Sequence, residues 1–229
     1  KLVVTVVTSP SLTVSSTTSE VPSAFVVVVV DSDAITPPSE PTVAVPSDVT
    51  VVPSAEVSLL YGITGSGKTS VFFKLIEQAV SDDKDVIVMV PEIALTPQTF
   101  ERFYRRFNVP LATLHSALSD RERLDAYLDV SGGRAAILLG TRSALFTPIP
   151  NLGLIVIDEE HDQSFKQSDG FRYHARSLAA VRARDCGCPL VLGSATLSLE
   201  TLYNVQRGLY RRLILSTRTA GARPPAIEL

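Results

Sequence analysis

Runs of aliphatic residues alternate with amphipathic segments along most of this chain. Near-continuous apolar runs predict buried strands at residues 57–61, 85–90, 111–115, 135–139, 153–157 and 189–192. Apolar residues at helical spacing predict helices at residues 68–80, 96–107, 119–130, 174–184 and 197–207. Buried strands that alternate with helices are typical of a parallel sheet covered by helices on both faces. We therefore expect one doubly wound α/β domain over residues 57–215.

The first 56 residues have a different pattern. Val, Ser, Thr and Pro dominate them, and residues 26–30 are all valine. Valine-rich runs favour strands, whereas the repeated prolines interrupt them. We expect an irregular or β-rich segment of short strands and extended chain over residues 1–56, without helix, and we assign it no chemistry.

Charge is distributed unevenly along the chain. The first 56 residues contain Lys1 against six carboxylates, a net charge of −5, and the whole chain carries −3, so the remainder carries +2. Contact with nucleic acid would therefore depend on local basic clusters after residue 56. Cys186 and Cys188 are too close together for an easy disulfide and too few for a zinc site, so we expect small buried residues in a reducing cytosol.

The N-terminus shows no secretory signal. It lacks a charged region followed by a sustained apolar run and a cleavage site. The apolar run at residues 24–30 is too short to cross a bilayer. We therefore expect a cytoplasmic protein that has no membrane partner.

A glycine-rich segment joins the first strand of the predicted domain to its first helix. It fills the pattern G-x-x-x-x-G-K-[ST]. In this pattern backbone N–H groups and the helix N-terminus face phosphate oxygens, the lysine reaches the β- and γ-phosphates, and the hydroxyl binds Mg²⁺. The alternative is a chance glycine turn. We favour a site for a nucleoside triphosphate and Mg²⁺, formed by Gly62, Thr64, Gly65, Ser66, Gly67, Lys68 and Thr69.

An acidic turn follows the predicted strand at residues 153–157. Asp158, Glu159, Glu160 and His161 should therefore emerge at the carboxyl end of the sheet, where open α/β folds bind ligands. Asp158 is suited to hold Mg²⁺ through water, and Glu159 to orient or deprotonate the water that attacks the terminal phosphate. The alternative is a solvated surface turn, but a phosphate loop on the same sheet favours the catalytic interpretation.

Two polar segments at the same edge of the sheet are candidates to contact a nucleic acid backbone. Pro91 and Thr96 flank a predicted helix start, where backbone N–H groups and a hydroxyl can meet a phosphate. The alternative for Thr96 is an ordinary helix cap. Thr141 and Arg142 follow the strand that ends at residue 139 and are a similar candidate pair.

Residues 165–176 interleave aromatic and basic side chains. This combination suits single-stranded DNA, because its nucleobases stack on aromatic rings and basic side chains neutralise its phosphate backbone. The alternative is that the aromatic side chains pack beneath a loop. The candidates are Phe165, Lys166, Phe171, Arg172, Tyr173 and Arg176.

Together these residues resemble a known family. Residues 62–69, 158–161 and 193–196 look like motifs I, II and III of superfamily 2 helicases of the DEAH-box type. The resemblance implies a RecA-like first motor lobe that binds ATP and Mg²⁺, with Lys68, Asp158, Glu159 and His161 as catalytic residues. His161 would relay between the ATP site and Ser194 or Thr196 of motif III; the alternative is a core histidine.

Three further segments, at residues 89–98, 140–148 and 162–176, are similar to the bacterial primosomal replication-restart helicases. This resemblance implies a 3′-to-5′ DNA translocase that acts on single-stranded or forked DNA together with replication-restart proteins. It also implies that residues 162–176 form an aromatic-rich loop that couples DNA contact to ATP hydrolysis.

The family also has a second motor lobe with a zinc module. We expect both to follow Leu229, with residues 216–229 as the linker, so zinc is not expected in this chain. The competing hypothesis is a nucleotide-dependent switch or regulatory ATPase that acts on a protein partner.

Overall fold

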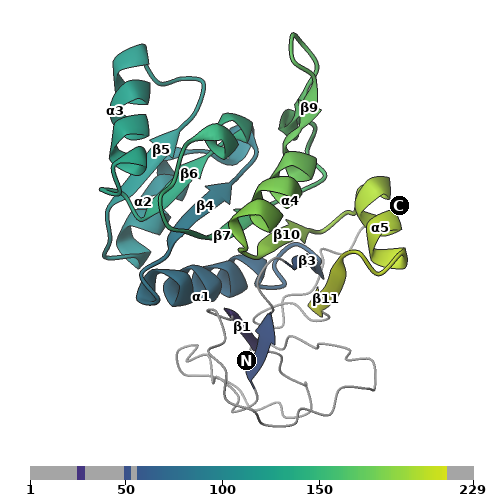
Figure 1. Cartoon of the computed structure of the whole chain (residues 1–229). Helices are drawn as coiled ribbons and strands as arrows, with labels where there is room; N and C mark the ends of the chain where they lie inside the picture. Colours follow the sequence, from purple (N-terminus) through teal and green to yellow (C-terminus); the bar gives the residue numbers. More distant parts are fainter. Residues whose placement is uncertain (1–24, 29–48, 53–55, 216–229) are drawn as a thin grey trace, which may run out of the picture.

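A seven-stranded sheet forms the centre of the molecule (Figure 1). The structure is a computed structural model, and it describes residues 25–28, 49–52 and 56–215. Each strand of this sheet runs parallel to its neighbours, in the order β11-β3-β10-β7-β4-β6-β5. The strands are β3 (Val57–Gly62), β4 (Asp85–Met89), β5 (Leu111–Leu114), β6 (Ile137–Gly140), β7 (Leu152–Ile157), β10 (Leu190–Ser194) and β11 (Arg211–Leu215).

Both faces of the sheet are apolar, which is why the strands appear in the sequence as unbroken aliphatic runs. Successive residues of a strand point to opposite faces. Val86 and Val88 of β4 therefore lie in one core cluster, whereas Ile87 and Met89 lie in another. All four side chains are at most 2% exposed.

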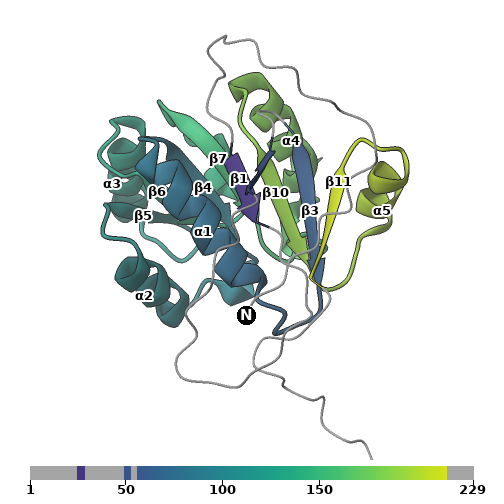
Figure 2. The ribbon, with the colours of Figure 1, turned by 90° about the horizontal axis from the view of Figure 1, so that it is seen from below.

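Helices cover both of these faces, so the predicted doubly wound α/β fold is confirmed. The cluster that contains Val86 also holds apolar residues of α1 and α2, and α1 lies across the near face of the sheet in Figure 2. The cluster that contains Ile87 holds α4 and Val205 of α5, and α3 packs beside β5 and β6. The helices are α1 (Lys68–Ser81), α2 (Pro97–Arg106), α3 (Asp120–Ser131), α4 (Ala175–Cys186) and α5 (Leu199–Gln206).

Two extended elements were not predicted. Strand β11 pairs with β3 at the edge of the sheet, and Arg211 and Arg212 hide its apolar character in the sequence. Strands β8 (Lys166–Gln167) and β9 (Tyr173–His174) form a separate antiparallel hairpin whose arms are too short for a periodic pattern. Three short 3₁₀ helices also lie between the main elements: η1 (Glu92–Ala94), η2 (Arg142–Phe146) and η3 (Gln163–Phe165).

The first 56 residues contribute one described pair of strands. Strands β1 (Phe25–Val28) and β2 (Val49–Val52) are antiparallel, and Phe25 pairs with Val52. The expectations for the rest of residues 1–55 and for the linker at residues 216–229 lie outside the described residues.

Two further expectations concern the cysteines and the membrane. Cys188 is buried as expected, whereas Cys186 is exposed. Within the ranges that the structure describes, no helix combines the length and the apolar character needed to span a bilayer.

Candidate nucleotide site and aromatic hairpin

The phosphate loop (residues 62–69) connects the end of β3 to the start of α1. Gly65 and Gly67 have φ angles of 80° and 92°, a left-handed conformation that glycine adopts without steric cost. The Gly67 carbonyl accepts hydrogen bonds from the N–H groups of Ser70 and Val71 at 2.9 and 3.2 Å. The glycines thus turn the chain sharply enough for α1 to begin directly at Lys68.

The loop has the chemistry of an anion site. Lys68 is 7% exposed, and its Nζ donates to the Gly62 carbonyl at 2.9 Å, across the mouth of the loop. The hydroxyl of Ser66 is buried and, among the described residues, has no hydrogen-bond partner. The first turn of α1 contains no acidic residue, so its positive N-terminal end is uncompensated. A triphosphate fits because its oxygens would satisfy these donors, with Thr69 half-buried beside them and Thr64 exposed at the tip.

The acidic turn (residues 158–161) follows β7 and lies between the ends of β4 and β10, the two strands that flank β7. Its Asp158 N–H donates to the Met89 carbonyl at 2.9 Å, and its Glu160 N–H donates to the Gly193 carbonyl at 2.9 Å. Glu159 has a φ angle of 49°, which is uncommon for a residue other than glycine. The sheet therefore holds the backbone of the turn from both sides, and it holds Glu159 in a strained conformation of the kind found at functional sites.

Asp158 is also electrostatically unusual. Burial and the neighbouring Glu159 carboxylate raise the pKa of Asp158 to about 6, against the opposing effects of the Glu159 N–H and the Lys68 ammonium. A cation bound beside Asp158 would favour the charged form of its carboxylate. In the described part of the chain, no group of three or more His, Cys, Asp and Glu side chains could hold a metal by itself. Mg²⁺ does not require one, because it keeps water and phosphate oxygens as ligands.

His161 lies beside the third motif. Its Nδ1 is 2.8 Å from the Ser194 hydroxyl, and it is also 3.7 Å from a carboxylate oxygen of Glu159. The Thr196 N–H donates to the same hydroxyl at 3.2 Å, whereas the Thr196 side chain is exposed. His161 therefore bridges the acidic turn and β10, and it is half-buried rather than a core histidine.

The sequence interpretation missed the role of Glu160. Its carboxylate is 0% exposed and accepts hydrogen bonds from Arg176 Nη1 at 2.5 Å, from the Ser198 hydroxyl at 3.0 Å and from the Thr201 hydroxyl at 2.9 Å. The Ser198 N–H donates to its other oxygen at 3.1 Å. The sequence around Ser198 and Thr201 has the spacing of a helix N-cap, but this spacing does not predict a contact with Glu160.

The expectation that Arg176 contacts DNA was wrong. Its side chain is 5% exposed because it forms an ion pair with the buried Glu160 carboxylate. Phe165 is a second correction: it is 0% exposed and packs in the apolar cluster beneath α4, as the alternative for these aromatic residues proposed.

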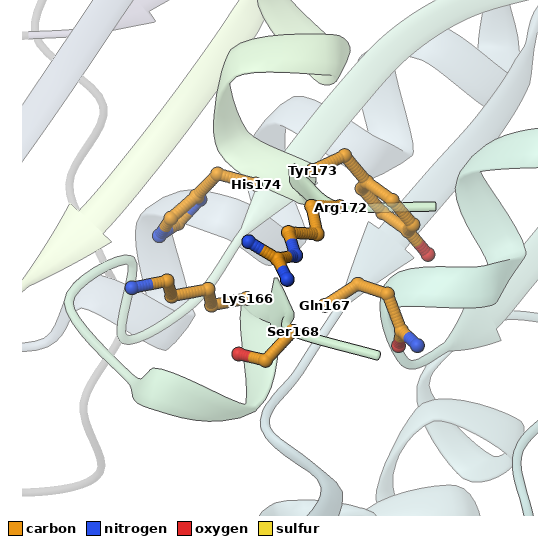
Figure 3. Close-up of a pocket in the computed structure, with 6 residues that line it drawn as sticks. All are labelled: Lys166, Gln167, Ser168, Arg172, Tyr173 and His174. Carbon is orange, nitrogen blue, oxygen red and sulfur yellow. The ribbon is translucent and has the colours of Figure 1, made fainter. Parts of the chain in front are cut away.

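The other aromatic and basic residues form what we call the aromatic hairpin (residues 166–174). Phe171 is 76% exposed at its tip, and its ring lies 5.9 Å from that of Tyr173. The Tyr173 ring in turn meets exposed Phe146 edge-on at 5.2 Å. Beside the Tyr173 ring is an open hollow of about 560 Å³, shown in Figure 3, and it is lined by Lys166, Gln167, Ser168, Arg172, Tyr173 and His174.

The remaining candidates for DNA contact have mostly structural positions. Pro91 and Thr141 are buried, which contradicts their assignment as surface contacts. The Thr96 hydroxyl accepts from the Thr99 N–H at 3.2 Å and caps α2, as the alternative proposed. Arg142 Nη1 donates to the Ser164 carbonyl at 2.9 Å and is thereby directed at the base of the aromatic hairpin.

The chain matches a helicase family and several replication restart proteins. The DEAD/DEAH box helicase family matches residues 49–205. Replication restart protein PriA of Haemophilus influenzae is 52% identical over 166 residues, which are 72% of this chain and 23% of that protein. PriA of Treponema pallidum is 45% identical over 181 residues, which are 79% of this chain and 28% of that protein. The chain thus spans about a quarter of the length of these relatives.

Solved structures agree on the fold. The structure of RecG bound to a three-way DNA junction superposes with a TM-score of 0.54 at 22% identity, and the match covers 76% of this chain and 22% of that chain. Together with the phosphate loop, the acidic turn and the His161–Ser194 contact at one edge of the sheet, these matches show that the chain belongs to the DEAD/DEAH box helicase family and is similar to replication restart protein PriA.

Proposed function

We propose that this chain is the ATP-binding motor lobe of a replication-restart DNA helicase, which couples ATP hydrolysis to movement along single-stranded DNA. One observation carries the proposal: the acidic turn beside the phosphate loop continues without a break into a hairpin with an exposed aromatic tip. The names of the PriA relatives support the assignment to replication restart. The proposed location is the cytoplasm, and the proposed partners are forked DNA and other replication-restart proteins.

Each residue of the nucleotide site has a proposed role. Lys68 exchanges the Gly62 carbonyl for the β- and γ-phosphates of ATP. Thr69 and Asp158 would hold Mg²⁺, which neutralises charge on the phosphates when it is bound. Glu159 orients the attacking water and accepts its proton, and His161 carries the state of the site to Ser194.

The aromatic hairpin is the proposed DNA side of this lobe. Phe171 and Tyr173 offer faces on which bases can stack, and Lys166 and Arg172 offer positive charge to the backbone. Thr196, whose side chain is exposed, is a secondary candidate at the same edge of the sheet.

ATP hydrolysis measured against single-stranded DNA concentration tests the proposal. The assay requires a longer protein that joins this chain to a second motor lobe. We expect stimulation by DNA, and we expect the Phe171→Ala/Arg172→Ala variant to lose most of the maximal stimulation. Its DNA affinity should also fall, because stacking contributes roughly 1–3 kcal/mol per base. The matched control is Tyr104→Ala/Arg105→Ala, an adjacent aromatic and arginine exposed on α2.

The same assay separates the motor from a nucleotide-dependent switch. A parent protein whose hydrolysis is indifferent to single-stranded DNA would indicate a switch that acts on a protein partner. Polarity is tested with partial duplexes: 3′-to-5′ movement predicts strand displacement from a substrate with a 3′ single-stranded tail and none from its 5′-tailed equivalent.

A further inference from the structure

Two arginines outside the aromatic hairpin hold its base. Arg142 Nη1 donates to the backbone carbonyls of Ser164, at 2.9 Å, and of Lys166, at 3.4 Å, where the chain enters the first arm. Arg176 follows the second arm directly and forms its ion pair with Glu160 of the acidic turn. The two arms are therefore fastened to different parts of the domain, one to η2 and the other to the turn that carries Glu159.

The second attachment is stiff. Arg176 Nη1 contacts both Glu160, at 2.5 Å, and the Ser198 hydroxyl, at 2.6 Å, and Arg176 Nη2 lies 3.5 Å from Glu200. Because the Glu160 carboxylate is fully buried and receives donors on both oxygens, it cannot turn without leaving a charged group unpaired. The network thus joins the hairpin base, the acidic turn and the start of α5.

Neither attachment suits a residue that touches DNA. The Arg176 guanidinium is almost completely buried, and Arg142 directs Nη1 at the protein's own backbone. Glu160, by contrast, is the chain neighbour of both Glu159 and His161, and its fully buried carboxylate ties the backbone that carries them to Arg176.

We propose that Arg142 and Arg176 are positioning residues that clamp the two arms of the aromatic hairpin, so that a displacement of the hairpin moves the acidic turn through Glu160. The proposal rests on the proposed function, because it describes how DNA at the hairpin would reach the ATP site. The covalent chain already links the acidic turn to Arg176 through residues 161–176. The clamp adds a second link, made by side-chain contacts between segments that are distant in the sequence.

The clamp itself is tested on this chain by amide hydrogen exchange. Arg176→Met should speed exchange at Glu160, Ser198 and the hairpin amides by at least about tenfold, because local opening no longer breaks an ion pair. Amides in the middle of β7 and β10 should keep their protection, which separates loosening of the clamp from general unfolding. Arg176→Lys, which keeps one charged donor, should restore part of the protection. Arg184→Met, an exposed arginine of the same helix, is the matched control.

Unchanged exchange at Glu160 and Ser198 in Arg176→Met would overturn the clamp. Should that variant not fold, Arg142→Met supplies the test, because Arg142 is half-buried and its loss leaves no buried carboxylate unpaired. We expect faster exchange at residues 164–167 in this variant, and unchanged exchange there would overturn the clamp equally.

Transmission is tested by DNA-stimulated ATP hydrolysis in the longer two-lobe protein. A clamp variant should lose most of the maximal stimulation while the DNA concentration for half-maximal effect changes less than about twofold. A variant that has lost a DNA contact would behave oppositely. Its maximal stimulation would be unchanged, a higher DNA concentration would be needed for the half-maximal effect, and the salt dependence of its DNA binding would fall by about one charge. That opposite result would overturn transmission and leave the proposed function standing, whereas a parent protein without DNA stimulation would overturn both.

Discussion

At the scale of single residues, Lys68 is the central group of the proposed phosphate site. Its ammonium group is almost buried, yet within the described ranges it has one hydrogen bond, to the Gly62 carbonyl of the loop that would surround the ligand. A carbonyl is a weaker partner for an ammonium group than a phosphate oxygen, because charge-assisted hydrogen bonds between two ions are the stronger kind. The proposed binding of nucleotide would therefore require this lysine only to exchange a weaker partner for a stronger one.

We expect Lys68→Ala to remove most of the affinity of this chain for a non-hydrolysable ATP analogue. The cost in free energy of unfolding should be only about 1 kcal/mol, since one hydrogen bond is lost. Calorimetric titration measures the affinity, and urea unfolding measures the stability. Lys74→Ala, which removes an exposed lysine of the same helix, is the control and should leave both unchanged. Equal affinity in Lys68→Ala and the parent chain would exclude this loop as the phosphate site.

Gly193 is a residue at which close packing leaves no room for a side chain. A Cβ atom there would lie 2.3 Å from Cζ of Phe72 and 3.2 Å from a carboxylate oxygen of Asp158. The Phe72 side chain is 3% exposed and packed in the core under α1, so it cannot move away freely.

We therefore predict that Gly193→Ala lowers the free energy of unfolding by about 1–3 kcal/mol through overpacking. Urea unfolding of Gly193→Ala, Phe72→Leu and the double variant measures the effect. The double variant should be more stable than the sum of the single changes predicts, because leucine leaves room for the new methyl group. Additive costs would show that the steric conflict is not with Phe72.

At the scale of elements, α4 begins in an unusual way. Its N-cap is His174, whose Nδ1 accepts a hydrogen bond from the Arg176 N–H at 3.3 Å. Burial lowers the pKa of His174, and the nearby Arg176 and Lys166 charges lower it further, whereas Glu160 and Glu200 act in the opposite direction. The folded protein thus favours the neutral imidazole, which is the form that can accept this hydrogen bond.

This arrangement predicts a loss of stability on acidification. Because the His174 pKa is lowered in the fold, the unfolded chain takes up the proton first as the pH falls through about 6.5, and unfolding is then favoured. His174→Asn keeps a capping oxygen but does not titrate. As the pH falls from 7.5 to 5.5, the free energy of unfolding of this variant should therefore rise relative to that of the parent. Chemical unfolding of both proteins at the two pH values measures this. Parallel pH profiles would mean that His174 does not supply the effect.

At the scale of the whole molecule, the described domain provides one side of the proposed nucleotide site. Its phosphate loop, acidic turn and third motif lie along one edge of a single sheet. In related phosphoryl-transfer sites, an arginine supplied from across the cleft contributes about 10³- to 10⁵-fold in rate.

We accordingly expect the purified 229-residue chain to bind nucleotide weakly, to hydrolyse it slowly and not to separate DNA strands. Fluorescent-analogue binding, phosphate release and displacement of a labelled strand measure these three properties. A protein that adds a second motor lobe is the comparison and should gain in all three. Strand separation by the chain alone at a comparable rate would show that no second lobe is required.

The sequence was sufficient wherever a structural feature depends on neighbouring residues. The glycines of residues 62–67 with Lys68 and Thr69 form a local turn, and the acidic turn follows directly from its strand, so both could be located from spacing alone. The same holds for the core strands, because burial on both faces leaves an unbroken aliphatic run. Strand β11 was missed because an edge strand is only partly buried, and its two arginines interrupt the apolar pattern.

The fate of charged and aromatic side chains depended on the tertiary structure. Sequence pattern indicates that Arg176 can neutralise a charge, but its partner Glu160 lies 16 residues away, and the Thr201 hydroxyl that completes the site lies 41 residues from Glu160. Phe165 and Phe171 have the same stacking capacity, yet one is buried beneath α4 and the other is exposed at a hairpin tip. Spacing determines which groups are available, whereas burial and long-range pairing determine which of them face a ligand, because a group already desolvated by the protein cannot also contact DNA.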